Sequence, residues 1–173
     1  MADQYPFRLR VLRALTARLE EISSAGGLYE FDMAGKVFRG RHWYGDDDPL
    51  PLISILEAPL PLDQIGSAND NTASAGQWEL LIQGFLDDDD KNPTDPAHFL
   101  LALTRQKLTE IRSEKSDQRV PGSQYNILGM GRRVTGLTIG PGVVRPPDDL
   151  SAKAYFWLSV TLSLAEQLDK PFE

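Results

Sequence analysis

The 173-residue chain contains no cysteine and only two histidines. Without cysteine it cannot form disulfides, thiolate zinc sites or a cysteine nucleophile. A basic excess is also missing, because 25 Asp and Glu outnumber 18 Lys and Arg and give a formal net charge of −7. Attraction to nucleic acid or to an anionic membrane requires a clustered basic face, so this balance disfavours non-specific binding to either and leaves open only a local basic patch.

Long hydrophobic runs are absent as well. No stretch approaches the roughly 18 consecutive apolar residues of a membrane-spanning helix. The first residues, "MADQYPFRLRVLRALTARLEE", carry too many charges for the apolar core of a signal peptide. We therefore expect a soluble protein made inside the cell, folded as one domain over 1–173, because this length and apolar content suffice for one hydrophobic core.

Two segments have the apolar spacing of amphipathic helices. The first, "YPFRLRVLRALTARLEEISSAGG", is predicted to stop at Gly26-Gly27, and the second to start at Asp95-Pro96, where Asp can cap free amides and Pro suits the first helical position. The apolar positions of the first helix are Val11, Leu12, Leu15, Leu19 and Ile22; those of the second are Ala97, Leu100, Leu101, Leu108 and Ile111.

The remaining patterned segments indicate strands. "LYEFDMAGKVFRGRHWYG" predicts one or two short strands with a turn, "PLISILEAP" and "WELLIQGFL" one strand each, and "YNILGMGRRVTGLTIGPGVVRPPDD" short pieces separated by glycines. "AKAYFWLSVTLSLAEQL" alternates with a period of two, which favours a strand over the alternative helix. The order predicts an α+β fold, a mainly antiparallel sheet with two helices packed on one face, and long loops near 58–76, 113–126 and 140–153.

Few residues suggest catalysis. Neither His42 nor His98 has a serine and an acid at an informative spacing, and the motifs H-E-x-x-H, G-x-S-x-G and Gly-Lys-Ser/Thr are absent. The glycine-rich "GMGRRVTG" has Val134 where a dinucleotide fingerprint needs a small residue, and no helix pattern follows it. We therefore expect structural or surface histidines, no cofactor and no enzymatic activity.

Four consecutive aspartates, Asp87 to Asp90, raise the question of a metal site, because hard cations prefer carboxylate oxygens. An EF-hand loop started at Asp87 or at Asp88 fails at the turn glycine and at the bidentate glutamate, and neighbouring side chains on an extended chain point to opposite sides. We expect a solvated strand-to-helix connection. A metal-dependent hydrolase that uses the aspartate runs is the alternative from another functional class.

Several arginines lie close together in the sequence, and arginine is enriched at protein interfaces as well as at phosphates. Because the chain is acidic and has no aromatic–basic module, we favour subunit or partner interfaces for these residues. They are Arg10, Arg13, Arg39, Arg41, Arg132 and Arg133.

Over "KVFRGRHWYGDDDPLPLISILEAP" and "WELLIQGFLDDDDKNPTDPAHFLLALTRQKL", the chain resembles the tail terminator (tail completion) proteins of long-tailed bacteriophages. In that family an N-terminal helix leads to a strand, often V-x-R-G-R, then to a second strand, a long strand, a helix and a C-terminal strand. The matching segments are 37–41, 51–55, 78–86, 96–111 and 155–164. The resemblance extends over most of the chain, but it depends on the order and spacing of these segments because each motif is short.

The resemblance implies a structural virion protein of the tail and neck, assembled in the host cytoplasm as a homo-hexameric ring. The ring would end polymerisation of the tail tube and meet the head–tail connector or stopper, without contact with a membrane; a connector or stopper ring subunit is the alternative. Genomic DNA would pass through the lumen without sequence-specific binding. Acidic residues that could line this channel are Asp46, Asp47, Asp48, Asp87, Asp88, Asp89 and Asp90.

Overall fold

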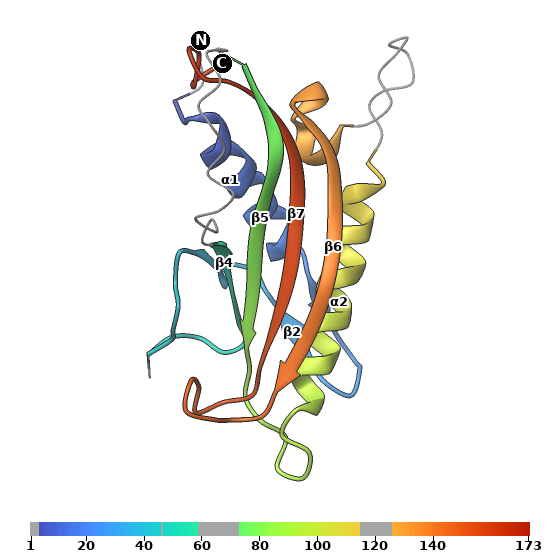
Figure 1. Cartoon of the computed structure of the whole chain (residues 1–173). Helices are drawn as coiled ribbons and strands as arrows, with labels where there is room; N and C mark the ends of the chain where they lie inside the picture. Colours follow the sequence, from blue (N-terminus) through green and yellow to red (C-terminus); the bar gives the residue numbers. More distant parts are fainter. Residues whose placement is uncertain (1–3, 46, 59–72, 115–125) are drawn as a thin grey trace.

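The computed structural model describes residues 4–45, 47–58, 73–114 and 126–173. Within these residues the chain has an α+β fold, with two α-helices, a mixed and mostly antiparallel five-stranded sheet, and a small two-stranded sheet (Figure 1). The small sheet pairs β1 (Ser23–Ser24) with β2 (Phe31–Asp32) in antiparallel orientation. This confirms the predicted fold class at the level of helices and sheet.

The large sheet has the order β3-β4-β5-β7-β6. Its strands are β3 (Val37–Arg39), β4 (Leu52–Glu57), β5 (Ala73–Phe85), β7 (Tyr155–Gln167) and β6 (Val134–Arg145). The two 13-residue strands β5 and β7 pair along their whole length and form its centre. Only β3 and β4 run parallel, so the sheet is mainly antiparallel, as predicted, with one parallel pair at its edge.

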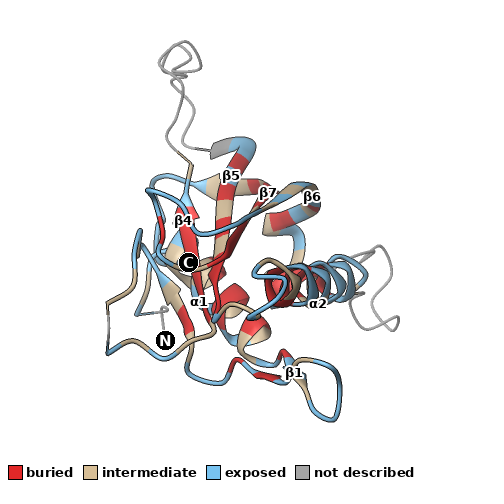
Figure 2. Ribbon diagram, turned by 90° about the horizontal axis from the view of Figure 1, so that it is seen from below, coloured by how far each residue is buried: buried red, intermediate tan, exposed pale blue. Residues whose placement is uncertain are grey.

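Both helices, α1 (Phe7–Glu20) and α2 (Asp95–Arg112), lie on the same face of this sheet (Figure 2). Their apolar stripes pack against every second residue of the central strands, such as Leu80 and Leu158. The prediction of β7 as a strand from its period-two alternation is therefore confirmed, and the alternation separates side chains that face the helices from those on the opposite face. Along β7, the side chains that face the helices are Phe156, Leu158, Val160, Leu162 and Leu164, and all are buried.

The boundaries of the helices differ in detail from the prediction. The first helix ends at Glu20, before Gly26-Gly27, because the chain turns at Glu21 and enters β1 at Ser23. The second helix does begin at Asp95-Pro96, but Thr94 is its N-cap residue and no side chain caps it. The predicted capping role of Asp95 is therefore wrong, and its carboxylate instead lies in the first turn, where it favours the helix dipole.

The segment after the second helix was predicted least well. Instead of short pieces broken by glycines, β6 is one strand of 12 residues that runs through Gly136, Gly140 and Gly142, with irregular register at two places. Two short 3₁₀ turns, η2 (Ile127–Gly129) and η3 (Gly131–Arg133), precede it. The glycines are tolerated because side chains from the neighbouring elements occupy the space where their Cβ atoms would lie, as Ser159 does at Gly140.

The predicted long loops are shorter than expected where the structure describes them. Residues 140–145 belong to β6, and 73–76 belong to β5. The rest of 58–76, apart from Ala58, and residues 115–125 of the segment 113–126 lie outside the described residues. Within the described part, no helix is both long and apolar enough to cross a bilayer.

Candidate functional site

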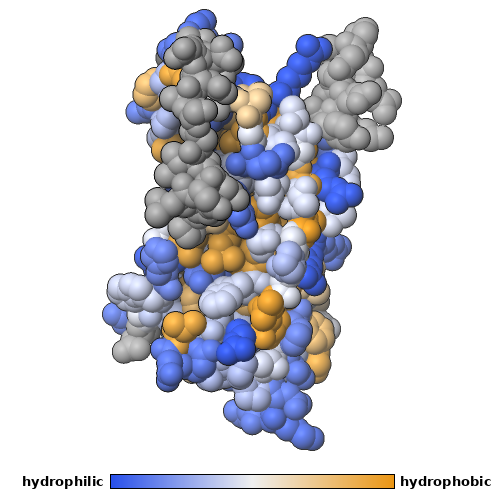
Figure 3. Space-filling view, in the orientation of Figure 1, coloured by the Kyte–Doolittle hydropathy of each residue, from blue (hydrophilic) through white to orange (hydrophobic). Residues whose placement is uncertain are grey.

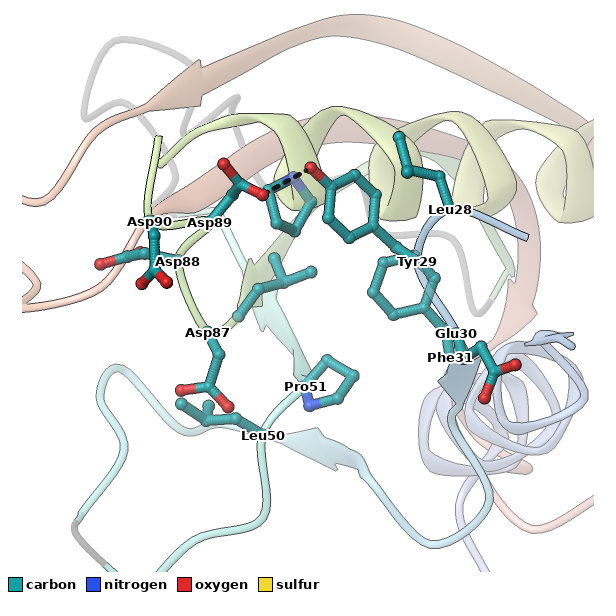
Figure 4. A pocket seen from close by; sticks show the side chains of 12 residues that line it. Leu28, Tyr29, Glu30, Phe31, Leu50, Pro51, Asp87, Asp88, Asp89 and Asp90 are labelled. Atoms are coloured by element: carbon teal, nitrogen blue, oxygen red, sulfur yellow. Dashed lines mark hydrogen bonds between the residues drawn. The ribbon is translucent and has the colours of Figure 1, made fainter. Parts of the chain in front are cut away.

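The four aspartates follow the end of β5 and form one wall of a pocket of about 500 Å³ (Figure 4). The opposite wall comes from the segment around β2, and the floor from the start of β4 and α2. Both apolar and acidic side chains line it; the lining residues are Leu28, Tyr29, Glu30, Phe31, Leu50, Pro51, Leu86, Asp87, Asp88, Asp89, Asp90 and Pro96. We call this hollow the acidic pocket.

The carboxylates of the acidic pocket have separate partners. Asp88 Oδ1 accepts a hydrogen bond from the Ala154 backbone N–H at 2.6 Å, and Asp87 forms an ion pair with Lys153 at 3.0 Å. Asp90 is exposed and makes no hydrogen bond or ion pair with the described residues. The run therefore connects β5 to the chain before β7, as well as to α2.

Asp89 organises the connection itself. Its Oδ1 atom accepts the backbone N–H groups of Asn92 at 2.7 Å and Lys91 at 2.9 Å, and its Oδ2 atom accepts the Tyr29 hydroxyl at 3.2 Å. These N–H donors favour the ionised form and lower the pKa of the Asp89 carboxyl below its ordinary value. The predicted strand-to-helix connection is confirmed, and one aspartate holds its turn in place.

Two other candidate chemistries for the described residues are a metal site and a histidine-based site. Among the described residues, no three His, Asp or Glu side chains are placed to hold one metal ion. His42 and His98 are both exposed, on the loop after β3 and on the first turn of α2, and neither imidazole has a hydrogen-bond partner within the described residues. The structure does not bring either histidine together with the aspartate run.

The second acidic run lies in the loop between β3 and β4. Asp48 accepts the Gly45 backbone N–H at 2.9 Å and pairs with Arg41, and these two interactions lower the pKa of its carboxyl. Asp47 is exposed, and Asp46 lies outside the described residues. The side chain of Asp48 therefore stabilises the loop, and only Asp47 presents an unpaired charge within the described part of this run.

Arg39 and Arg41 are used inside the subunit. Arg39 donates a hydrogen bond to the Thr16 hydroxyl of α1 at 2.9 Å, which ties the edge strand β3 to the helix layer. Arg41 pairs with Asp48 and stacks over Phe38 at 4.1 Å. These contacts account for both residues without an interface, although part of each side chain remains accessible.

The other four predicted interface arginines gather at the start of α1 and at η3. Arg133 lies over the Phe7 ring at 3.8 Å and Arg10 over the same ring at 5.7 Å, while Arg13 lies over Tyr5 at 4.3 Å. Burial, and then the nearby charge of Arg10, lower the pKa of Arg133. We call Arg10, Arg13, Arg132 and Arg133 the arginine cluster.

The acidic pocket and the arginine cluster lie at opposite ends of the sheet, because β5 ends at the bottom of Figure 1, before the pocket's aspartates, whereas β6 begins at the top, after Arg132 and Arg133. The pocket adjoins the Phe85–Tyr155 pair, where β5 ends and β7 begins, and the cluster adjoins Val134, which pairs with Leu164 near the end of β7. At about 3.3 Å per strand residue, the part of β7 between Tyr155 and Leu164 separates them by roughly 30 Å. The subunit is therefore electrically asymmetric along its strands.

The sheet face opposite the helices is open over the described residues. Figure 3 shows this face, on which weakly polar side chains lie beside scattered apolar ones. One end of it holds a small aromatic cluster in which Phe85, Tyr155 and Trp157 are in contact, with Tyr44 from the β3–β4 loop on top. At its edge, Gln83 Oε1 and Trp157 Nε1 are buried without a hydrogen-bond partner in the described part, although these two residues are cross-strand neighbours.

Sequence reasoning missed the exposed apolar side chains on the loops. Leu28, Trp43 and Leu150 are 77%, 72% and 71% exposed, and Leu28 stands on the rim of the acidic pocket. Each lies in a segment rich in turn-forming residues, without a period that could separate an outward from an inward position. Large exposed apolar residues in loops are typical of contact surfaces.

No protein-family model matches the chain, and no curated protein matches it at a significant level.

Proposed function

We propose that this protein is the ring-forming subunit of a phage tail terminator. Six copies would form a ring on the end of the tail tube, stop the addition of tube subunits, and present the surface that joins the head–tail connector. In this proposal the chain is a structural protein of the virion without enzymatic activity, and DNA passes through the ring.

The observation that carries the proposal is the order of elements along the chain. The five segments that resemble the terminator family each fall on one element, in the order β3, β4, β5, α2 and β7, with α1 before them. In particular, the segment V-F-R-G-R forms the edge strand β3 and the turn that follows it, and 155–164 forms most of the closing strand. The agreement supports the resemblance at the level of topology, which short motifs alone cannot do.

The surface of the subunit supports assembly into a ring. Subunits of a cyclic oligomer contact each other through two different surfaces, one on each side. This chain has unlike ends, one acidic and one rich in arginine, and large apolar side chains exposed on its loops. These are the properties that head-to-tail contacts between identical subunits require.

The acidic runs give a reason why DNA would not adhere to the ring. Carboxylates that face the lumen repel phosphates over roughly 8 Å at physiological salt. We expect reversal of the charges in Asp46–Asp48 or in Asp87–Asp90, whichever run lines the channel, to slow DNA ejection from assembled particles. If reversal of each run left both assembly and ejection unchanged, the lumen assignment would be wrong.

The test of the function is to add the purified protein to tail tubes that are still growing. We expect the tubes to stop at defined lengths and electron microscopy to show a six-fold ring on one end only. Tubes that grow equally long with and without the protein would contradict the proposal. Rings that bind isolated connectors but not tubes would indicate the stopper alternative, and a metal-dependent hydrolytic activity of the monomer would indicate the enzyme alternative.

A further inference from the structure

We propose that neighbouring copies contact each other end to end, with Arg132 of one copy, beside Arg133, entering the acidic pocket of the next. This inference rests on the proposed ring and names the surfaces that would build it. It assigns Asp87–Asp90 to the subunit contact instead of the lumen.

The acidic pocket has the charge and shape for a guanidinium group. Five carboxylates line it, and the one cation paired with them among the described residues is Lys153, which binds Asp87. Asp90 has no partner in the described part of the chain, so negative charge remains available at the rim. The walls between the carboxylates are apolar or aromatic, and Tyr29 offers a ring on which a flat guanidinium can stack.

Arg132 and its neighbour Arg133 supply the positive charge for this contact. Arg132 is exposed and forms no ion pair or hydrogen bond within the described residues, and Arg133 Nη2 is buried without a hydrogen-bond partner there. The Arg133 guanidinium is held over Phe7, near the like charge of Arg10 and the carboxylates of Glu166 and Glu173, so Arg132 is the member of the pair that is free to reach another molecule. Arginine donates two parallel hydrogen bonds to a carboxylate, so the pocket supplies the group that Arg132 lacks within the described residues.

Other occupants of the pocket suit these observations less well. A metal ion needs several oxygens directed at one point, whereas Asp87, Asp88 and Asp89 are each drawn to a different partner. Nucleic acid phosphates would be repelled by the pocket. A second copy of the chain supplies the arginines at the end of the subunit roughly 30 Å away, and contact between two unlike ends is heterologous, as ring closure requires.

The test is an exchange of charges between the two surfaces. The pocket variant is Asp87→Lys with Asp90→Lys, which leaves the hydrogen bonds of Asp88 and Asp89 in place. The cluster variant is Arg132→Glu with Arg133→Glu, and Arg132→Glu alone serves where the loss of the Arg133–Phe7 contact impairs folding. A third protein carries the pocket and cluster changes together, and all are checked by circular dichroism for the native fold.

A matched control changes the same amount of charge elsewhere. Glu79→Lys with Asp149→Lys alters two exposed carboxylates that have no side-chain partner within the described residues and lie outside the acidic pocket. Sedimentation velocity measures the oligomeric mass and the association constant of each protein. Because electrostatic contacts weaken as salt screens them, the wild-type association constant should also fall between low and high ionic strength.

We expect the pocket and cluster variants each to associate at least about tenfold more weakly than the wild type, and the combined protein to return to within about threefold. The Glu79–Asp149 control should stay within about threefold of the wild type. If the wild type forms six-fold rings and the reversed variants form them equally well, this contact is wrong and the proposed function stands. If the wild type forms no ring in solution or on tail tubes, both proposals are wrong.

Discussion

The two faces of the central sheet are formed by the same strands but differ in their side chains and in what covers them. On the covered face, fully buried aliphatic side chains meet α1 and α2 in one continuous core. On the open face, serine, threonine and glutamine residues surround a small aromatic cluster. The covered face holds the fold together, whereas the open face and the loops at the sheet ends are free to serve contacts with other molecules.

The largest difference should come from one substitution made on each face of β5. Leu80 is fully buried on the covered face, and its neighbour Leu81 is partly exposed on the open face. We expect Leu80→Ala to lower the free energy of unfolding by about 2–5 kcal/mol, and Leu81→Ala to lower it by about 1 kcal/mol or less. Urea denaturation measures both, and equal losses would show that the open face is also a packed core.

A second prediction concerns how tightly the covered side of β5 is packed. A Cβ atom at Gly84 would lie 2.1 Å from the buried Phe156 ring, whereas one at Gly76 would meet nothing within 4 Å. Gly84→Ala should therefore cost about 1–3 kcal/mol of unfolding free energy because Phe156 has no room to move. Gly76→Ala is the control on the same strand, and thermal unfolding should leave it within about 0.5 kcal/mol of the wild type.

On the open face, a paired and an unpaired polar group can be compared directly. The buried Tyr155 hydroxyl donates to Asp148 at 2.8 Å, whereas Trp157 Nε1 is buried without a partner among the described residues. Tyr155→Phe should lower the unfolding free energy by about 1–2 kcal/mol, while Trp157→Phe should leave it nearly unchanged, because no hydrogen bond is lost. A large loss for Trp157→Phe would reveal a role for the indole N–H.

The smallest effect should appear on acidification. Asp48, in the loop over the open face, has a pKa below its ordinary value because it accepts the Gly45 N–H and pairs with Arg41. A lowered folded-state pKa stabilises the protein above about pH 4, and this contribution is lost as the pH falls through the folded-state value. Asp48→Asn should make the melting temperature less dependent on pH between 5 and 3, as scanning calorimetry at each pH would show. An unchanged pH dependence would mean that the ion pair does not stabilise the loop.

The sequence predicted the elements whose period was long and regular. Both helices, β4, β5 and β7 lie where their apolar patterns place them, because burial of one face requires that spacing. It failed at β6, where glycines suggested interruptions although neighbouring side chains fill their space, and at Asp95, where Thr94 takes the capping position. The parallel pairing of β3 with β4 could not be predicted from a local sequence pattern either, because it depends on the path of the chain between the two strands.

The candidate surfaces were predicted only in part. The aspartate run and the arginines stand out in the sequence, but their partners are far away along the chain: Asp88 binds the Ala154 N–H, and Arg39 binds Thr16. No local pattern could show that Arg39, Arg41 and Arg133 make contacts within the subunit while Arg132 is exposed without a partner among the described residues. The exposed Trp43 was missed for the same reason.

By itself, the sequence determined which residues could form a core, because hydrophobic periodicity is a local property of the chain. It also determined the excess of acidic charge and the absence of any cysteine chemistry. Only the tertiary structure decided that the acidic pocket and the arginine cluster lie at opposite ends of one sheet. That arrangement follows from the pairing of β5, β7 and β6, in which residues distant in sequence become neighbours through backbone hydrogen bonds.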